Sequence, residues 1–284
     1  MATDIPPSRT AYRLSFALAV VAAVASALTF FASGLLRGPA VMNGSARGTG
    51  LVVLLVTVPV LLVAMAAAAR GSTRGLLVWI GAVAHVLYQS VLFLFATPFN
   101  DLFLLYVAMF GLALWSAVAL LVSLDASAVR ARIAPALPVR QIAIYVWVVA
   151  GLNALAWLGP VAKALRDDAP PAFLVGTGMT TNPIYVQDLA FWLPLMAVAA
   201  WWLWRRRDWG FVVIGAMLAM WLLESVTVAT DQWMGHHADP SSNVATLGGT
   251  YLFAALGVIG VVPLAAFYRR VTDVSRGRVR KASP

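Results

Sequence analysis

One ionisable side chain stands inside an almost wholly apolar stretch of this chain. The stretch covers residues 211–231, FVVIGAMLAMWLLESVTVATD, and its internal carboxylate is Glu224. A carboxylate at bilayer depth costs about 3 kcal/mol on insertion scales, so such a residue usually faces a protein interior or an aqueous cavity. There it can accept a proton, bind a cation or act as a general acid. The structural alternative is a protonated Glu224 that hydrogen-bonds to a neighbouring helix.

A polar face continues from Glu224 toward the end of the same stretch. Thr227 and Asp231 follow three and seven residues later, which places them on one side of a helix. We expect this face to open toward the outer surface of the membrane. Asp188 lies just inside another apolar stretch, after the letters TTNPIYVQ. Either aspartate could therefore serve with Glu224 as an acid and base pair.

A second polar face is expected on the apolar stretch 75–97. His85, Tyr88 and Gln89 are spaced by three and four residues, and His85 falls close to the middle of the membrane. An imidazole there can shuttle protons near neutral pH, although a histidine that only packs and hydrogen-bonds is the commoner case. Asn153 is interpreted as a hydrogen-bonding contact between helices, with a place in a polar site as the alternative.

Ligand types that suit a divalent metal gather after residue 230, namely Asp231, His236, His237 and Asp239. Two adjacent histidines cannot both point at one ion from a regular helix, and a solvated loop explains them equally well, so no metal site is predicted. The sequence has no cysteine and no phosphate-loop, dinucleotide, zinc-protease or serine-hydrolase motif. We therefore expect no cofactor and assign no catalytic residue, and the balance favours binding or transport over an enzyme.

Composition places these side chains in a membrane protein. Of the 284 residues, 62% are hydrophobic and 11% are charged, and the mean hydropathy is +0.86. Such values lie outside the range of soluble domains, so the lipid bilayer is the expected partner. Apolar stretches predict an all-α, polytopic membrane protein with about eight transmembrane helices, near residues 12–36, 50–69, 75–97, 102–124, 140–164, 186–204, 210–230 and 248–268.

Arginine and lysine set the expected orientation. If the helices alternate, most basic residues lie on one face, at both chain ends and in the short connections near residues 70–74, 130–140 and 205–207. This asymmetry predicts a multi-pass protein of the cytoplasmic membrane with both termini in the cytoplasm. The net charge of +9 does not indicate nucleic acid, because the arginines do not line a face with interleaved aromatic residues. Long outer connections are expected at residues 38–48 and 167–182.

The order of long and short connections occurs twice and predicts an internal repeat. Shifting the chain by 135 positions aligns residues 58–91 with residues 193–226 without a gap, and Gln89 then meets Glu224. If the duplication is real, these two residues lie at the same depth and face each other across a pseudo-twofold axis. The alternative is coincidence between two apolar segments with basic ends.

The predicted organisation is a single membrane domain over residues 1–284. It consists of a first four-helix half at residues 12–124, a second at residues 140–268 and a basic cytoplasmic tail at residues 269–284. Each half has an even number of helices, so the halves share one membrane orientation.

Two segments resemble stretches of uncharacterised bacterial multi-pass membrane proteins. They are TTNPIYVQDLAFWLPLMAVAAWWLWRRRDWG and NDLFLLYVAMFGLALW, and the resemblance depends mainly on TNPIYVQDLAF and the WRRRDWG turn. It implies a multi-pass fold and a membrane location. No activity is attached to that group, so the resemblance carries no catalytic residue to this chain.

These observations favour an integral membrane protein that binds or translocates a small solute or amphipathic molecule. The expected site is an outward-facing polar cavity centred on Glu224, with Gln89 and His85 as its partners. A membrane-embedded enzyme acting on a lipid-soluble substrate is the first alternative. A structural or sensory subunit without a substrate is the second. The oligomeric state and the substrate are not indicated by the sequence.

Overall fold

The structure is a computed structural model that describes residues 7–273. This part of the chain contains helices and no β-strand, and eight helices in it are long and apolar enough to cross a membrane. The predicted fold class is confirmed, whereas residues 274–284 of the predicted basic tail lie outside the described residues. The helices, including the π-helical segments η1 and η2, are α1 (Arg9–Phe31), α2 (Ala40–Val52), η1 (Val53–Thr57), α3 (Val58–Ala69), α4 (Thr73–Phe95), α5 (Phe103–Val122), α6 (Ala126–Ala131), α7 (Val139–Ala164), α8 (Pro183–Gln187), η2 (Asp188–Trp192), α9 (Leu193–Trp204), α10 (Asp208–Ala238) and α11 (Leu247–Tyr268).

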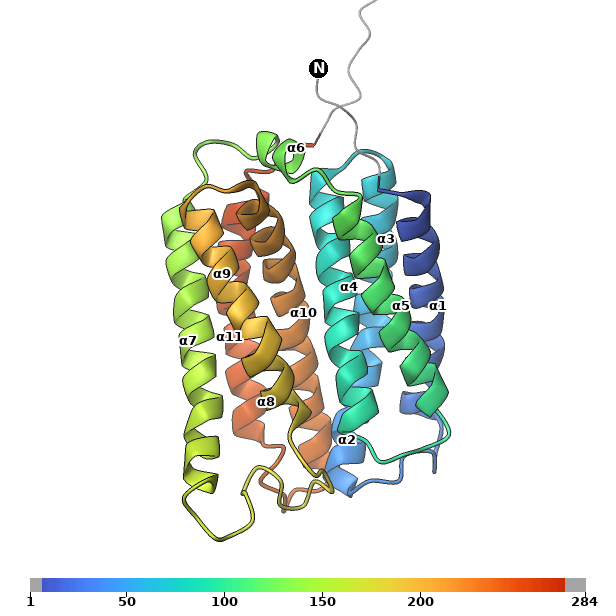
Figure 1. Ribbon diagram of the computed structural model, residues 1–284. Helices are drawn as coiled ribbons and strands as arrows, with labels where there is room; N and C mark the ends of the chain where they lie inside the picture. Colours follow the sequence, from blue (N-terminus) through green and yellow to red (C-terminus); the bar gives the residue numbers. More distant parts are fainter. Residues whose placement is uncertain (1–6, 274–284) are drawn as a thin grey trace, which may run out of the picture.

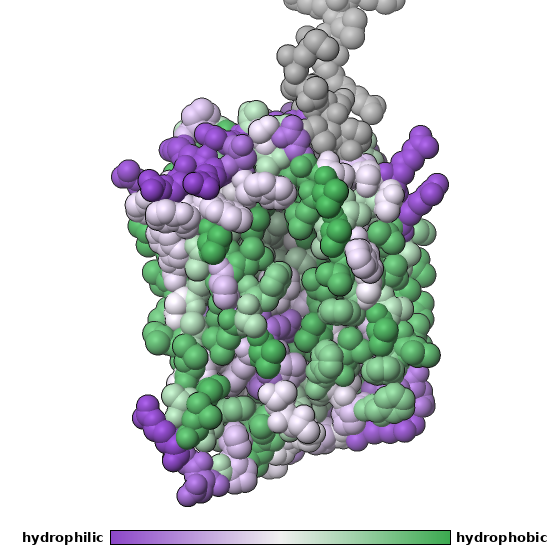
Figure 2. Space-filling view, in the orientation of Figure 1, coloured by the Kyte–Doolittle hydropathy of each residue, from purple (hydrophilic) through white to green (hydrophobic). Residues whose placement is uncertain are grey.

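The first four spans lie beside the last four (Figure 1). Helices α1–α5 occupy one side of the view and α7–α11 the other, and the short helix α6 lies at one end of the molecule. Helix α1 begins and α11 ends at this same end, as an even number of spans requires. Hydrophobic residues dominate the surface between two ends where hydrophilic residues gather (Figure 2). The protein is therefore a multi-pass membrane protein, and the end that faces the cytoplasm stays a prediction.

Two spans contain a π-helical turn at the same relative place. In each turn a backbone N–H donates to the carbonyl five residues earlier, from Val58 to Val53 and from Leu193 to Asp188. The next residue is a proline in both spans, Pro59 after Val58 and Pro194 after Leu193. Proline has no N–H to donate to the preceding turn, and the widened turn lets the helix continue past it. The two turns are 135 positions apart, and each precedes a 12-residue α-helix.

The predicted outer connection at residues 38–48 is wrong, because most of it belongs to α2. Gly44 and Gly48 are one helical turn apart and let α2 lie directly on α10, where a Cβ atom on Gly48 would come within 2.7 Å of Asp231 Cα. Close packing of this kind stabilises a helix whose glycine-rich sequence has a weak helical preference of its own. Helix α10 correspondingly runs to Ala238 and includes both histidines of the DQWMGHHA segment.

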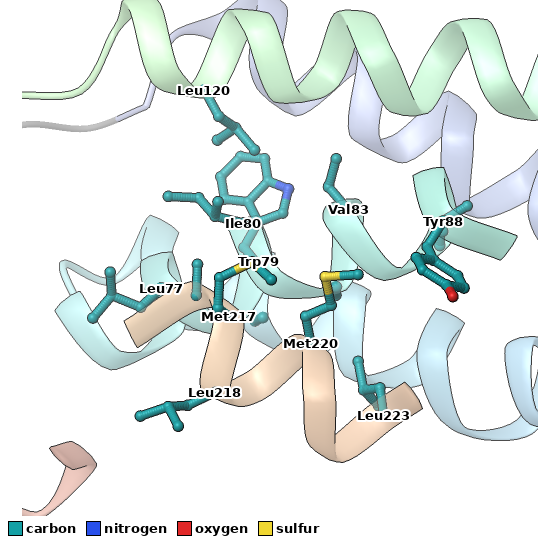
Figure 3. Packing of buried hydrophobic residues seen from close by; sticks show 14 of the residues in the cluster. Leu77, Trp79, Ile80, Val83, Tyr88, Leu120, Met217, Leu218, Met220 and Leu223 are labelled. Carbon is teal, nitrogen blue, oxygen red and sulfur yellow. The ribbon is translucent and has the colours of Figure 1, made fainter. Parts of the chain in front are cut away.

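Helices α4 and α10 form the centre of the molecule. They are the most buried spans, with 67% and 61% of their apolar windows inside the protein. Met217 and Met220 of α10 point toward the side of α4 that carries Ile80 and Val83 (Figure 3). Gly81 of α4 lies so close to the α10 backbone that a side chain there would collide with it. The two helices are therefore near enough for their polar side chains to meet directly.

The two groups of spans differ in how their helices pack against one another. In the first group, α1 packs against α5 and completes a ring of four spans. In the second group, α9 and α11 pack against α10 and α7 packs against α9, and α7 and α11 are among the least buried spans, at 22% and 17%. These two helices therefore turn most of their surface away from the rest of the protein.

Candidate functional site

Gln89, His85 and Glu224 meet at the interface between α4 and α10. Gln89 Nε2 donates a hydrogen bond to Glu224 Oε2 at 2.5 Å, and His85 Nε2 lies 3.4 Å from the same oxygen. Gln89 and His85 are one helical turn apart on α4, so both project toward α10. They are fully buried, whereas the Glu224 side chain keeps 17% of its surface exposed. The three residues that the sequence singled out are thus in direct contact, and we refer to them as the central cluster.

Two threonines set the tautomer of His85. Thr227 Oγ1 donates to the Leu223 carbonyl at 2.9 Å, so it accepts from His85 Nε2 at 3.0 Å. Thr57 Oγ1 lies 3.2 Å from His85 Nδ1, which is then the accepting nitrogen of a neutral ring. The Nε2–H group also faces Glu224. The neutral imidazole therefore presents its Nε2–H group to the carboxylate, and Nδ1 is the nitrogen that can take up a further proton.

Thr57 was not predicted as a site residue. It is fully buried in η1, and it brings a third span to the central cluster. The available signal was its type, because it is the one polar residue between positions 51 and 69. Its partner could not be read from the sequence, since the contact with His85 depends on how η1 packs against α4.

A second carboxylate, Asp188, lies at the first position of η2. Trp157 Nε1 of α7 donates to Asp188 Oδ2 at 2.8 Å. Tyr88 of α4 lies beside the same carboxylate, and its ring centroid is 5.9 Å from that of Trp192. Because Tyr88 is the residue before Gln89, Asp188 is close to the central cluster without bonding to it. Trp157 is a further residue that sequence reasoning missed, since tryptophan is common in spans for packing alone.

Asp231 and Asn153 lie outside the central cluster. Asp231 is two helical turns beyond Glu224 on α10 and lies on the α2 side, where Ser45 Oγ donates to its backbone carbonyl at 3.1 Å. Its Oδ1 atom is buried and has no hydrogen-bond partner among residues 7–273. Asn153 is half-buried on α7, one turn before Trp157, and within the described residues no hydrogen bond joins it to the central cluster.

The central cluster has acceptors left over for a ligand. Gln89 Oε1 is buried and, in the part of the chain that the structure describes, has no donor. The carboxylate bonded to the other end of this amide remains partly exposed. Figure 2 shows hydrophilic surface in a recess between the two groups of spans, part-way along the hydrophobic belt. Surplus acceptors beside a carboxylate suit a ligand that donates hydrogen bonds or carries positive charge.

The described residues contain no group of three or more histidine, aspartate or glutamate side chains that could hold a metal ion. What the fold and the surface define is a class of protein, an all-α multi-pass integral membrane protein with a polar cluster between its two central helices. Comparison of the chain with protein-family models, with curated proteins and with solved structures found no match.

Proposed function

We propose that the protein binds a small solute with a protonated amine or a similar hydrogen-bond donor at Glu224 and carries it across the membrane. The observation that carries this proposal is the buried Gln89 Oε1, which has no hydrogen-bond partner among residues 7–273, beside the partly exposed Glu224 carboxylate. A donor group that reaches the exposed edge of Glu224 and the neighbouring amide would satisfy both acceptors at once. An unsatisfied buried acceptor costs about 1–3 kcal/mol, so a ligand that pairs with it gains that energy on binding.

His85 supplies the coupling in this proposal. When Glu224 is ionised, its charge attracts a cationic solute, and when Glu224 takes a proton, the attraction is lost. The proton reaches Glu224 from the imidazolium form of His85, whose Nε2 is 3.4 Å from Glu224 Oε2, and this transfer leaves a neutral ring protonated at Nδ1 beside Thr57. Exchange of a proton for a cationic solute at one carboxylate is the simplest scheme that uses all three members of the central cluster. It requires no nucleotide, in keeping with the absence of nucleotide motifs.

Transport by two related halves is part of the same proposal. Gln89 and Glu224 are 135 positions apart and bonded to each other, and Gly81 packs against Ala216 at the same offset. Equivalent residues contact each other in this way when two copies of a helix pack around a twofold axis. The π-helical turns repeat at the same offset. These pairs support the predicted duplication, and many secondary transporters place their site between two repeated halves.

The test is solute binding and transport by the purified protein in liposomes. A panel of small amines and their uncharged isosteres would be screened by thermal stabilisation, and hits would be followed as uptake driven by a proton gradient. We expect an amine hit whose stabilisation disappears in Glu224→Gln. The matched control is Asp101→Asn, an exposed carboxylate that pairs with Arg37. If Glu224→Gln retains full binding and uptake, Glu224 is not the site.

Acid–base catalysis on a lipid-soluble substrate is the second candidate. The observation that favours it is Asp188, a second buried carboxylate that lies close to Glu224. Trp157 of the weakly buried helix α7 contacts this carboxylate, so a lipid-soluble substrate would approach it from the bilayer past α7. Lipid extracts of cells with Asp188→Asn or Glu224→Gln would then accumulate a precursor, which a transporter would not produce. If neither variant changes lipids, binding or uptake, a structural or sensory role remains.

We also propose that the α6 end faces the cytoplasm in the cell membrane, because positive charge concentrates there. The protein has no native cysteine, so single cysteines report orientation cleanly. Ser127 and Ser241 are matched positions, since each is exposed and each hydroxyl donates to an aspartate two residues earlier. In intact cells an impermeant maleimide should label a cysteine at 241 and spare one at 127. The reverse pattern would contradict the orientation.

A further inference from the structure

A basic depression lies at the α6 end of the molecule, far from the central cluster along the helices. It has a volume of about 450 Å³ and is lined by Arg130, Trp202, Arg206, Arg207, Asp208 and Trp209. These residues come from α6, from the end of α9, from the turn that follows it and from the first residues of α10. Hydrophilic surface gathers at this end of α7 and α9 (Figure 2). The depression therefore stands where the hydrophobic belt gives way to polar surface.

Its charge balance is positive. Asp208 is the acidic residue of the lining, and it forms an ion pair with Arg130, with 2.8 Å between Asp208 Oδ1 and Arg130 Nη1. Arg206 and Arg207 form no ion pair with any carboxylate among residues 7–273, and both side chains are exposed. Two uncompensated guanidinium groups thus border a cavity large enough for a phosphate group. Arginine is the side chain that binds phosphate oxygens in a bidentate manner.

Arg206 has an unfavourable backbone conformation in the lining. Its φ angle is 54°, and it is the one residue other than glycine with a positive φ in the described chain. The corresponding position of the first hairpin, 135 residues earlier, is Gly71, whose φ is 87°. Glycine adopts this conformation freely, whereas another residue costs about 1–2 kcal/mol. An arginine where the related turn has glycine indicates that its side chain is needed there.

We infer that this depression binds the phosphate group of an anionic lipid in the adjacent leaflet. Arg206 and Arg207 supply the charge that pairs with the phosphate. The indole rings of Trp202 and Trp209 occupy the depth that tryptophan favours at a membrane interface, where they contact the glycerol and upper acyl region. A soluble phosphate compound presents the same chemistry, so the two sources must be separated by experiment. The inference does not depend on the function of Glu224.

The decisive variant is Arg206→Gly, which removes the charge and gives the turn the residue of the first hairpin. Purified protein would be heated in detergent alone, with added phosphatidylglycerol, with added phosphatidylcholine and with inorganic phosphate. For the natural protein we expect phosphatidylglycerol to raise the unfolding temperature and phosphatidylcholine to leave it unchanged. In Arg206→Gly the apparent affinity for phosphatidylglycerol should fall about tenfold. Without lipid, the variant should be as stable as the natural protein or more so, because the strain is relieved.

Controls separate charge from backbone effects. Arg206→Asn removes the charge but keeps a side chain that tolerates positive φ, so it should match Arg206→Gly in lipid affinity. Arg70→Gln, in the first hairpin, should leave the affinity unchanged. Stabilisation by inorganic phosphate that Arg206→Gly abolishes would place a soluble phosphate compound in the same site. Equal stabilisation of natural protein and Arg206→Gly by phosphatidylglycerol, or none in either, would overturn the inference.

Discussion

Gln89 Nε2 and Glu224 Oε2 are 2.5 Å apart across the α4–α10 interface, and the two residues are separated by the same 135 positions that relate the π-helical turns. A neutral amide and an ionisable acid therefore face each other across the interface of the two central helices. A pair of carboxylates at this contact would repel, and a pair of amides could not hold a proton. One residue of each kind gives a bonded pair that still titrates.

Exchanging these two residues tests the relationship. Gln89→Glu alone places two carboxylates in contact inside the protein, and we expect it to lower the unfolding free energy by about 2–4 kcal/mol. The exchange variant, Gln89→Glu with Glu224→Gln, restores the amide–carboxylate pair. His85 is one turn from position 89 on the same helix, so it can still reach the carboxylate. Unfolding of each variant in detergent gives the coupling free energy through a double-mutant cycle.

If the exchange variant recovers at least half of the unfolding free energy that Gln89→Glu loses, the result would support a paired contact near a twofold axis. Loss of stability in the exchange variant equal to the sum of the two single losses would contradict it. In that case the contact would depend on the surroundings of each position more than on the pair itself.

The hydroxyl of Thr57 should be required for the buried state of His85. Thr57→Val keeps the shape of the side chain but removes the partner of Nδ1, which lies 3.2 Å away and is fully buried. Leaving this nitrogen unpaired should cost about 1–3 kcal/mol of unfolding free energy. Thr57→Ser retains the hydroxyl and is the matched control. Equal stability of the valine and serine variants, measured by unfolding in detergent, would show that the bond contributes nothing.

The sequence predicted the helical architecture and the meeting of Gln89, His85 and Glu224. Span-length apolar stretches leave few alternatives to transmembrane helices, because backbone groups in lipid must be paired within the helix. The three polar residues could be matched because the internal offset placed Gln89 and Glu224 at one depth. Helical spacing then added His85 on the same face.

Other contacts depended on packing that one sequence does not show. Thr57 meets His85 because η1 lies against α4. Residues 38–48 were predicted as an outer connection, whereas close approach to α10 makes their glycines favourable in a helix. The hydrogen bond from Trp157 to Asp188 could not be predicted, because the packing of α7 against η2 depends on the tertiary structure.

Acid should loosen α6 through its N-terminal cap. Asp125 accepts bonds from the Ser127 hydroxyl at 2.7 Å, the Ser127 amide at 2.9 Å and the Ala128 amide at 3.2 Å. The Ser127 hydroxyl first, then the Ala128 amide, hold the pKa of Asp125 below its ordinary value of 3.8. A lowered pKa means that the cap stabilises α6 at neutral pH, and that this contribution is lost as the pH falls through 3.8 toward the lowered value.

Amide hydrogen exchange of α6 between pH 2.5 and pH 6, corrected for intrinsic rates, measures this loss. The natural protein should show exchange protection that declines at the acid end of the range. Asp125→Asn keeps an N-cap acceptor that does not titrate, so its protection should be independent of pH. The ion pair between Asp208 and Arg130 of α6 is present in both proteins, so a difference between them comes from Asp125. A decline of equal size in Asp125→Asn would assign the effect to a group other than Asp125.

Gly81 should be the residue of α4 least able to accept a side chain. Its position faces α10, where an added Cβ would collide with the Ala216 carbonyl oxygen and lie 3.1 Å from Ala219 Cβ. Because the obstruction is backbone, Gly81→Ala must separate the two central helices, at a cost of about 1–3 kcal/mol in unfolding free energy. Gly111→Ala on α5 meets no atom within 4 Å and should be neutral or stabilise by about 0.5–1 kcal/mol. Separation of α4 from α10 would also lengthen the Gln89–Glu224 contact, so Gly81→Ala should weaken ligand stabilisation as well as the fold. A Gly81→Ala protein as stable as Gly111→Ala would contradict the close approach on which the central cluster depends.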